Sequence, residues 1–369
     1  MRRDNWPRLL GLILLVGAVA PVAAGTVTGV VFVDANGNGT REAGEAGLPG
    51  VLVSDGAQVL PTDAAGSYAL PLPAEGALVR LSIPTGYWPA AMRWFERVAP
   101  AETATCDFPL QAQAQTSPWT MVQVTDVHFI LPAAAKVAAW CAQVNALQPA
   151  PVLVMATGDL VMESNAVSDP TIIRRLFSDY ATAVAPLHAP RFDLPGNHDH
   201  PGVKGTLPPG DPLYGVRGFE TLLGPAWYSL NYAGVHLLTL DGSTITLGNV
   251  GNGVAPECLA WLRADLAATP AGTPLLVFVH QPPGQWGNKA DVQAVLAGRT
   301  VLGIFTGHTH ASPEYAWAGF HVHEGGALCG GWWTGPCPDG KPRGFRLLQV
   351  TPQSVQTQYV VAAEPPPAP

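Results

Sequence analysis

The feature that most constrains the fold of this chain is a set of five short polar clusters, each of which directly follows an apolar run. The clusters are Asp126–His128 after residues 120–125, Gly158–Asp159 after 152–156, Gly196–Asp199 after 192–195, His280 after 275–279, and Gly307–His310 after 301–306. Apolar runs of this length predict buried strands. Because the carboxyl ends of strands in an open α/β sheet meet at one edge, where ligands bind, we expect the five clusters to converge there.

The side chains in these clusters suit transition metals. Imidazole nitrogen, carboxylate and amide oxygen together match Zn, Mn or Fe better than the all-oxygen shells of Ca or Mg. Seven donors are too many for one tetrahedral ion. They divide into two sets of four if one carboxylate bridges, as in centres whose ions lie about 3.5–4 Å apart. The candidate ligands are Asp126, His128, Asp159, Asn197, His280, His308 and His310.

A single histidine from this set would more often be structural than a ligand, so the argument rests on the joint pattern. The chain contains 10 histidines, and five of them lie at predicted strand ends beside Asp, Asn or Gly. The other histidines have no such support, and we interpret them as structural. These are His188, His200, His236, His321 and His323.

In this order, Asp-x-His, Gly-Asp, Gly-Asn-His-Asp, His and Gly-His-x-His resemble the motifs of the calcineurin-like metallophosphoesterases, over about residues 119–362. The resemblance implies an α/β fold with a β-sandwich flanked by helices, in αββα layers, and a metal-dependent phosphoric ester hydrolase. It implies one metal held by Asp126, His128, Asp159 and His310, and another held by Asp159, Asn197, His280 and His308. Asp159 is then the bridge. Met162 stands where purple acid phosphatases carry a tyrosine ligand, which argues against that subgroup and leaves Mn, Fe and Zn open.

The expected chemistry follows from charge. A water held between two cations has its pKa lowered toward neutrality, so it can attack phosphorus as a metal-bridging hydroxide while the metals neutralise the phosphoryl oxygens. The leaving oxygen still needs a proton or a hydrogen bond. His198 is next to Asn197 and has no ligand role in the family pattern, so we expect it to act as general acid or leaving-group stabiliser. Asp199 is expected to orient it.

Residues 25–110 predict a separate all-β domain, because strand-like runs alternate with Gly, Pro and Asp turns and no helical pattern interrupts them. A small β-sandwich is the natural way to bury one face of each strand. Residues 111–118 are predicted to be a linker to the domain at 119–362, and the Pro-rich tail 363–369 is predicted to be disordered. Helical segments are predicted at 133–147, 171–184, 256–266 and 290–296.

A calcium-type loop lies at the start of this β domain. The spacing Asp-x-Asn-x-Asn-Gly-x5-Glu gives the candidate ligands Asp34, Asn36, Asn38, Thr40, Glu42 and Glu45. The flanks are strand-like, which disfavours a helix-loop-helix EF-hand. The segment resembles instead the calcium-binding β-sandwich B-repeat domains of bacterial surface adhesins, over about residues 26–110. A hairpin turn without metal is the alternative.

Residues 1–24 are predicted to be a signal peptide. Three arginines precede an apolar run from 9 to 20, and small residues stand before Gly25. This run is shorter than the roughly 20 residues that span a bilayer, so no membrane span is expected after processing. We therefore expect an exported protein in the periplasm, in the medium or at the cell surface. The Sec and twin-arginine routes both stay open.

The net charge of the chain limits which binding partners are compatible with it. The formal net charge is −8, and it becomes more negative after cleavage because residues 1–24 contain three Arg and one Asp. This excludes a broad surface for duplex nucleic acid and favours a small phosphoester substrate, whose negative charge bound metals would balance.

The chain contains 5 cysteines, so at least one has no disulfide partner within the chain. A Cys329–Cys337 disulfide and two buried thiols both stay open. Oligomeric state is open.

Two classes of function are compatible with these patterns. The leading hypothesis is an exported two-metal phosphoester hydrolase, with a cyclic nucleotide or glycerophosphodiester phosphodiesterase as one variant. The alternative is a calcium-dependent surface adhesion or scaffold protein with an inactive phosphoesterase fold. Loss of a ligand would favour the alternative, and none of the seven is lost. Monoesters and diesters are not distinguished by these motifs.

Overall fold

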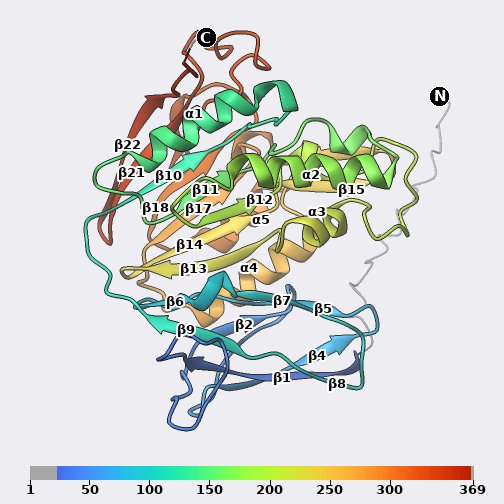
Figure 1. Ribbon diagram of the computed structural model, residues 1–369, viewed down its shortest axis with the longest axis vertical. Coiled ribbons are helices and arrows are strands. Elements are labelled where there is room, and N and C mark those ends of the chain that lie inside the picture. The colour runs from blue at the N-terminus through green and yellow to red at the C-terminus, as the bar shows by residue number, and fades with distance from the viewer. Residues whose placement is uncertain (1–22, 367–369) are drawn as a thin grey trace, which may run out of the picture.

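The structure is a computed structural model, and it describes residues 23–366 (Figure 1). The predicted signal peptide lies outside the described residues, except for Ala23 and Ala24 at the start of the first strand. Within residues 23–366, no helix is long and apolar enough to cross a membrane. Figure 1 shows a small all-β unit, in blue and cyan, beside a larger α/β unit.

Two sheets form the N-terminal unit. One has the order β4-β1-β9-β6, with β8 also paired to β1, and contains β1 (Ala23–Val33), β4 (Ser67–Pro73), β6 (Tyr87–Pro89), β8 (Thr103–Thr105) and β9 (Phe108–Ala112). The other has the order β3-β2-β5-β7 and contains β2 (Leu52–Ser54), β3 (Val59–Pro61), β5 (Ala77–Leu81) and β7 (Phe95–Val98). Val27 and Leu70 of the first sheet share a buried cluster with Val53 and Leu81 of the second. The predicted β-sandwich is confirmed.

Two further sheets form the α/β unit. The first has the order β12-β11-β10-β21-β22 and contains β10 (Trp119–Val124), β11 (Val154–Thr157), β12 (Arg191–Leu194), β21 (Gly344–Thr351) and β22 (Ser354–Val361). The second has the order β13-β14-β17-β18-β20-β19 and contains β13 (Tyr228–Tyr232), β14 (Val235–Leu240), β17 (Leu275–Val279), β18 (Val301–Thr306), β19 (Glu314–Trp317) and β20 (Phe320–Glu324). A separate hairpin contains β15 (Ser243–Thr246) and β16 (Asn249–Asn252).

Helices cover the outer faces of these sheets, and Figure 1 shows α1 and α2 lying over β10, β11 and β12. The α-helices are α1 (Ala134–Asn145), α2 (Pro170–Val184), α3 (Val216–Leu222), α4 (Pro256–Ala268) and α5 (Lys289–Leu296). Short 3₁₀ helices are η1 (Ala90–Met92), η2 (Leu131–Ala133), η3 (Ser164–Ala166), η4 (Asn197–Asp199) and η5 (Pro283–Gln285). All four predicted helical segments are helices, and α3 was not predicted.

The strands divide their side chains between two apolar layers. Met155 and Phe278 point into the cluster between the sheets, whereas their neighbours Val154 and Val277 join the cluster under the helices. Because successive side chains of a strand point to opposite faces, β10, β11, β14 and β17, whose residues are all buried, are covered on both sides. The predicted αββα layering is therefore confirmed.

Two segments differ from the sequence-based boundaries. Gln111 and Ala112, predicted as linker, are the last residues of β9 because they pair with β6. The tail 363–369 is predicted to be disordered, but the Ala363 N–H donates to Gln143 at 2.7 Å and Arg343 Nε donates to Glu364 at 2.8 Å. The described start of the tail thus packs on the α/β unit.

A buried seam joins the two units. Trp94 of the N-terminal unit is 6% exposed, and its ring centroid lies 4.6 Å from that of Tyr228 and 5.6 Å from that of Phe192. The hydroxyl oxygens of Ser82 and Ser229 lie 2.9 Å apart across the seam. The core between the two α/β sheets therefore continues into the N-terminal unit.

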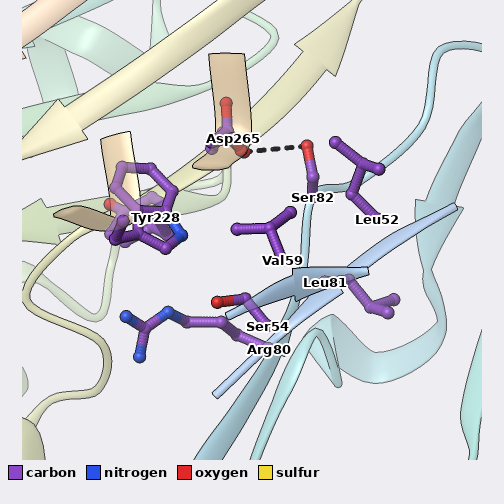
Figure 2. A pocket seen from close by; sticks show the side chains of 10 residues that line it. Leu52, Ser54, Val59, Arg80, Leu81, Ser82, Tyr228 and Asp265 are labelled. Carbon is purple, nitrogen blue, oxygen red and sulfur yellow. Dashed lines mark hydrogen bonds between the residues drawn. The ribbon is translucent and has the colours of Figure 1, made fainter. Parts of the chain in front are cut away.

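A small cavity lies in this seam (Figure 2), lined by residues of both units that include Arg80, Ser82, Tyr228 and Asp265. Its volume of ≈ 10 Å³ is close to the minimum of about 10–15 Å³ that one water needs. The buried Arg80 guanidinium lies 3.8 Å from Glu220 Oε1. The cavity is thus a packing gap beside a buried ion pair, too small for an organic ligand.

Replacing Trp94 tests how strongly the seam stabilises the protein. Truncating a buried tryptophan removes its contacts and leaves a cavity, so we expect Trp94→Ala to lower the free energy of unfolding by about 3–5 kcal/mol. Urea denaturation followed by circular dichroism measures this. Leu60→Ala, at a position 37% exposed, is the control and should change stability by less than about 0.5 kcal/mol. A Trp94→Ala protein as stable as the wild type would contradict this account of the seam.

Candidate metal centre

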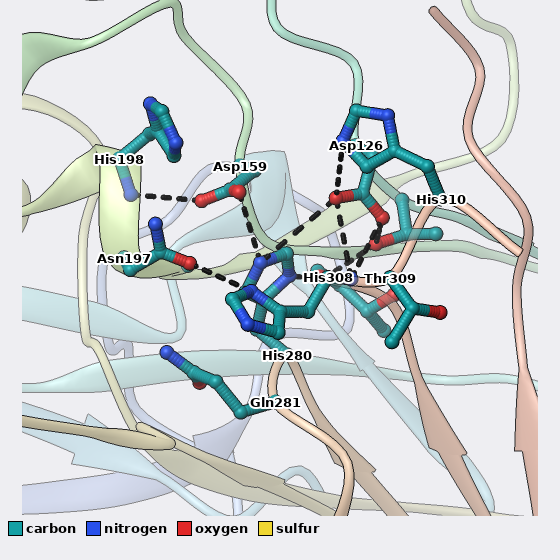
Figure 3. A network of polar contacts seen from close by, with 12 residues as sticks. Asp126, Asp159, Asn197, His198, His280, Gln281, His308, Thr309 and His310 are labelled. Atoms are coloured by element: carbon teal, nitrogen blue, oxygen red, sulfur yellow. Dashed lines mark hydrogen bonds and ion pairs between the residues drawn. The ribbon is translucent and has the colours of Figure 1, made fainter. Parts of the chain in front are cut away.

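The five polar clusters meet at one edge of the α/β unit (Figure 3). They follow β10, β11 and β12 in one sheet and β17 and β18 in the other, and these strands run parallel within each sheet. Side chains that are far apart in the sequence thereby become neighbours. His128 Nε2 lies 3.1 Å from His310 Nε2, and His308 Nδ1 lies 2.9 Å from Asn197 Oδ1.

Two glycines allow the loops to approach this closely. A Cβ on Gly196 would lie 2.3 Å from the backbone nitrogen of Asp159, and a Cβ on Gly307 would lie 1.8 Å from Thr125 Oγ1. Only glycine, which has no Cβ, leaves room for atoms this close to its backbone. Any other residue at either position would push the ligand loops apart.

A first group of candidate ligands surrounds the Asp126 carboxylate. Asp126 Oδ1 lies 3.3 Å from His310 Nε2 and 3.8 Å from His128 Nε2. His128 Nε2 also lies 3.5 Å from Asp159 Oδ2. Donors bound to one tetrahedral ion at about 2.0–2.1 Å are separated by about 3.4 Å, so these four side chains fit a shared cation.

A second group lies on the other side of Asp159. His280 Nε2 is 3.0 Å from Asp159 Oδ2, and the ring centroids of His280 and His308 are 5.3 Å apart. One donor atom from each of Asp159, His280 and His308 lies within 4.8 Å of the others, and Asn197 is hydrogen-bonded to His308. Asp159 Oδ2 is close to both groups, so this carboxylate lies between the two sets of donors.

Backbone carbonyls orient two of the imidazoles. His280 Nδ1 lies 2.8 Å from Thr157 O, and His310 Nδ1 lies 2.9 Å from Gly330 O. A carbonyl only accepts, so each Nδ1 carries a hydrogen and, in the neutral ring, each Nε2 presents a lone pair to the cluster. His280 Nε2 is buried and makes no hydrogen bond within the described residues, which fits a metal-binding nitrogen.

The backbone at five of the candidate ligands is left-handed. The φ angle is 51° at Asp126, 41° at His128, 52° at Asp159, 73° at His308 and 56° at His310. Non-glycine residues adopt this region in only a few per cent of cases, at a cost of about 1–3 kcal/mol each. Such strain persists only where the surrounding structure holds it, and it clusters at functional sites.

Carboxylates and imidazoles balance one another in the cluster. Burial opposes ionisation of Asp126, but the charge of His280 and the nearby imidazoles of His128 and His310 lower the pKa of Asp126 well below its usual range. Burial lowers the pKa of His280, but the charge of Asp159 outweighs it and raises the value to about 9. The protons on these imidazoles lie where metal ions would bind, so metal binding is coupled to the release of protons.

His198 lies beside the first group. Its backbone N–H donates to Asp159 Oδ1 at 2.8 Å, and its ring centroid is 4.8 Å from that of His128. Burial is the largest cause that lowers the pKa of the His198 imidazole. The structure therefore places His198 next to the candidate ligands.

Asp199 differs from its predicted role of orienting His198. Its carboxylate accepts the backbone N–H groups of Gly196, Leu160 and Val161 at 2.9–3.1 Å. These contacts hold the loop that carries Asp159, rather than the imidazole of His198. The groups that Asp199 contacts belong to a loop distant in the sequence. The local Gly-Asn-His-Asp motif does not show which loop that is.

Trp332 forms a wall of the site beside His128 and His310. Its ring centroid lies 4.5 Å from that of His128 and 4.9 Å from that of His310, and the residue is 47% exposed. The neighbouring Trp333 donates from Nε1 to His128 O at 3.0 Å. The Gly-Gly pair before Trp332 is typical of a tight turn, and here the turn places the Trp332 ring beside the candidate ligands.

The structure shows thiols, and not a disulfide, at Cys329 and Cys337. Among residues 23–366, all five cysteines are free and buried. Cys329 and Cys337 share a small apolar cluster, and Cys329 Sγ lies 3.8 Å from His310 Nδ1. The structure therefore has two buried thiols where a disulfide was the other alternative.

The calcium-type loop is closed by its own polar groups. Asp34 accepts three backbone N–H groups of the following turn at 2.8–3.2 Å. Glu42 accepts the side-chain amides of Asn36 and Asn38 at 2.9 and 3.1 Å, and Glu45 accepts the Glu42 N–H at 3.0 Å. The loop thus gathers these candidate ligands in one turn.

Comparison with known proteins gives two family matches. Residues 120–312 match "Calcineurin-like phosphoesterase", and residues 35–113 match "N terminal of Calcineurin-like phosphoesterase". The N-terminal match is to a domain that accompanies phosphoesterases, and the predicted likeness to adhesin domains stays a prediction.

Two curated relatives share part of the chain. A "Probable cyclic nucleotide phosphodiesterase" of Rhodopseudomonas palustris is 27% identical over 225 residues, which are 55% of this chain and 77% of the relative. A "Probable glycerophosphodiester phosphodiesterase" of Arcobacter nitrofigilis is 28% identical over 195 residues, which are 47% of this chain and 62% of the relative.

Solved structures that match part of the chain were also found. GAP50, the anchor in the inner membrane complex of Plasmodium, has a TM-score of 0.47 and 11% identity, with 68% of this chain and 87% of that chain covered. The phosphopantetheinyl hydrolase of Mycobacterium tuberculosis has a TM-score of 0.36 and 15% identity, with coverage of 57% and 90%.

Replacing Asp199 should disturb the centre without removing a ligand. Asp199→Ala leaves three buried N–H groups without their acceptor, at about 1–3 kcal/mol each, so we expect the free energy of unfolding to fall by about 3 kcal/mol or more. Metal retention should fall as the Asp159 loop loosens. Denaturant melts and elemental analysis after gel filtration check both effects.

Asp179→Ala is the matched control, because Asp179 forms a surface ion pair with Arg175 at 3.5 Å and such pairs are worth about 0–1 kcal/mol. Slower turnover with unchanged stability and metal content in Asp199→Ala would favour the orienting role instead.

Proposed function

We propose that this chain, which belongs to the calcineurin-like phosphoesterase family, is an exported two-metal hydrolase of small phosphodiesters. One observation carries the proposal. Asp159 Oδ2 lies 3.5 Å from His128 Nε2 and 3.0 Å from His280 Nε2. These histidines follow strands of different sheets, so two independent sets of donors face one carboxylate oxygen, as a bridging ligand requires.

The proposed metals are Mn, Fe or Zn, because the donors are mainly imidazole and carboxylate. Asp126, His128, Asp159 and His310 would hold one ion, and Asp159, Asn197, His280 and His308 would hold the other. When bound, two such cations lower the pKa of a water and neutralise charge on the phosphoryl oxygens. Asp159 and the loop contacts of Asp199 keep the two groups of donors at a set separation.

His198 is proposed to stabilise the leaving oxygen. Its backbone is tied to Asp159, which sets its ring beside the first group of ligands. Because burial lowers the pKa of the imidazole, the ring is neutral near pH 7 and still carries one N–H. It therefore donates a hydrogen bond to the leaving oxygen rather than starting as an imidazolium.

The preference for diesters is supported by the names of the two relatives, both of which are phosphodiesterases. The exposed face of Trp332 beside His128 offers an apolar surface for a second ester group, since aromatic rings pack well against nucleosides and other flat or apolar groups. Export is proposed from residues 1–24, as argued from the sequence.

A substrate panel tests the proposal. Protein stripped by a chelator and reloaded with Mn, Fe or Zn is assayed with bis-p-nitrophenyl phosphate, p-nitrophenyl phosphate, cyclic AMP and a glycerophosphodiester. We expect at least one diester to exceed the monoester in kcat/KM by about tenfold, a difference of about 1.4 kcal/mol. Asp159→Ala should lose paired metals and turnover. His198→Ala should keep both metals and slow turnover by about 10²–10⁴-fold.

His188→Ala, at an exposed position, is the matched histidine control and should behave like the wild type. Protein that holds two ions and hydrolyses no member of the panel would contradict the proposed activity and favour a scaffold role. A His198→Ala enzyme as fast as the wild type would remove only the assignment of His198.

We also propose that the N-terminal loop binds Ca²⁺, with Asp34, Asn36, Asn38, Thr40, Glu42 and Glu45 as ligands. The support is the loop spacing, together with the hydrogen bonds that gather Asn36, Asn38, Glu42 and Glu45 in one turn. In modules of exported proteins such sites bind at about 10⁻⁴–10⁻³ M. The ion would then rigidify the β-sandwich.

Melting curves of zinc-loaded protein with and without Ca²⁺ test this second proposal. At ten times its Kd, Ca²⁺ stabilises the bound fold by about 1.4 kcal/mol, so we expect a higher Tm in the transition of the N-terminal unit. Glu45→Gln should abolish the shift, and Glu102→Gln, at an exposed position, should retain it. Superimposable curves for the wild type would contradict calcium binding.

A further inference from the structure

A second group of metal-type side chains lies on the β19–β20 hairpin, apart from the candidate metal centre. His321 and His323 are two residues apart on β20 and so point to the same face. Glu314 of β19 is paired with His323 in the antiparallel register. One donor atom from each of the three lies within 4.8 Å of the others. From the sequence, both histidines were interpreted as structural.

His323 is the member that structural packing alone does not explain. It is 3% exposed, and its ring stacks on Phe305 with centroids 4.9 Å apart and an interplanar angle of 8°. Neither ring nitrogen makes a hydrogen bond within the described residues. A buried polar atom without a partner costs about 1–3 kcal/mol, so a ligand from outside the chain would account for this imidazole.

The neighbouring donors face a common point. His323 Nδ1 lies 3.3 Å from Glu314 Oε1, and the rings of His321 and His323 have centroids 4.3 Å apart. Donors of one tetrahedral ion at about 2.0–2.1 Å are separated by about 3.4 Å. The 3.3 Å separation of His323 Nδ1 and Glu314 Oε1 matches that expected for two ligands of one cation.

The charges around the group suit metal binding. Burial, the largest cause, lowers the pKa of His323 to about 4, so the ring keeps a lone pair at neutral pH. Burial opposes ionisation of Glu314, but the hydrogen bond and charge of Arg346 outweigh it and lower the pKa of Glu314. Arg346 and Thr357 both donate to Glu314 Oε1, which orients the carboxylate as outer hydrogen bonds do in metal sites.

We propose that Glu314, His321 and His323 form a peripheral transition-metal site with zinc-type preference. Two imidazoles and a carboxylate match that class of cation, and solvent would complete the coordination. Glu314 and His321 are exposed and give an ion access, while the buried His323 anchors it. The hairpin contains none of the seven candidate ligands, so the proposed site is separate from the candidate metal centre.

Zinc stoichiometry of the full chain tests this site independently of activity. Protein saturated with zinc and passed through gel filtration is analysed by inductively coupled plasma mass spectrometry. We expect His321→Ala and Glu314→Gln to retain one zinc fewer than the wild type, with unchanged phosphoesterase turnover. In competition with a chromophoric chelator, each variant should bind zinc at this site at least about tenfold more weakly than the wild type does.

Two further proteins make the result decisive. His188→Ala should retain the wild-type number of ions, which controls for loss of any exposed histidine. Asp159→Ala, which removes the bridging position of the candidate metal centre, should still retain one zinc that a second substitution, His321→Ala, removes. Equal zinc content and affinity in the wild type, His321→Ala and Glu314→Gln would overturn the proposal. That outcome would leave the two-metal centre untouched.

Discussion

The carboxylate of Asp159 is the group on which the arrangement of the ligand loops depends. Its Oδ2 faces histidines that follow strands of both sheets, and its Oδ1 accepts the N–H of His198. The apolar layer between the sheets is non-directional, so it holds the sheets together without setting the positions of individual side chains. Directional contacts at the strand ends supply that precision, and Gly196 leaves the room for them.

Such an edge is costly to fold. Five candidate ligands hold left-handed backbone conformations, and buried carboxylates lie among imidazoles. The opposing stability comes from elsewhere, from strands buried on both faces and from the seam in which Trp94 extends the core between the sheets. The N-terminal unit is thus part of the support of the α/β unit as well as the carrier of the calcium-type loop.

The chain places metal-type side chains in two different ways. The candidate metal centre uses the ends of parallel strands, where loops from both sheets converge. The hairpin group uses the face of a strand, where His321 and His323 alternate with Val322 and meet Glu314 across the ladder. The first arrangement follows from strand-end motifs, whereas the second contains no motif and depends on which residue the register sets opposite His323.

The amino-acid sequence by itself determined the donor types, their order along the chain and the division into an all-β part followed by an α/β part, because apolar runs, turns and strand-end motifs are local patterns. The αββα layers were implied by the family resemblance that these motifs carry. Only the tertiary structure decided that Asp199 holds the Asp159 loop, that Trp332 covers His128, and that Gln111 continues a strand. Each of these depends on a contact between residues distant in the sequence. Which distant residue arrives at a given place is set by the packing of whole sheets and by strand register, which no short segment encodes.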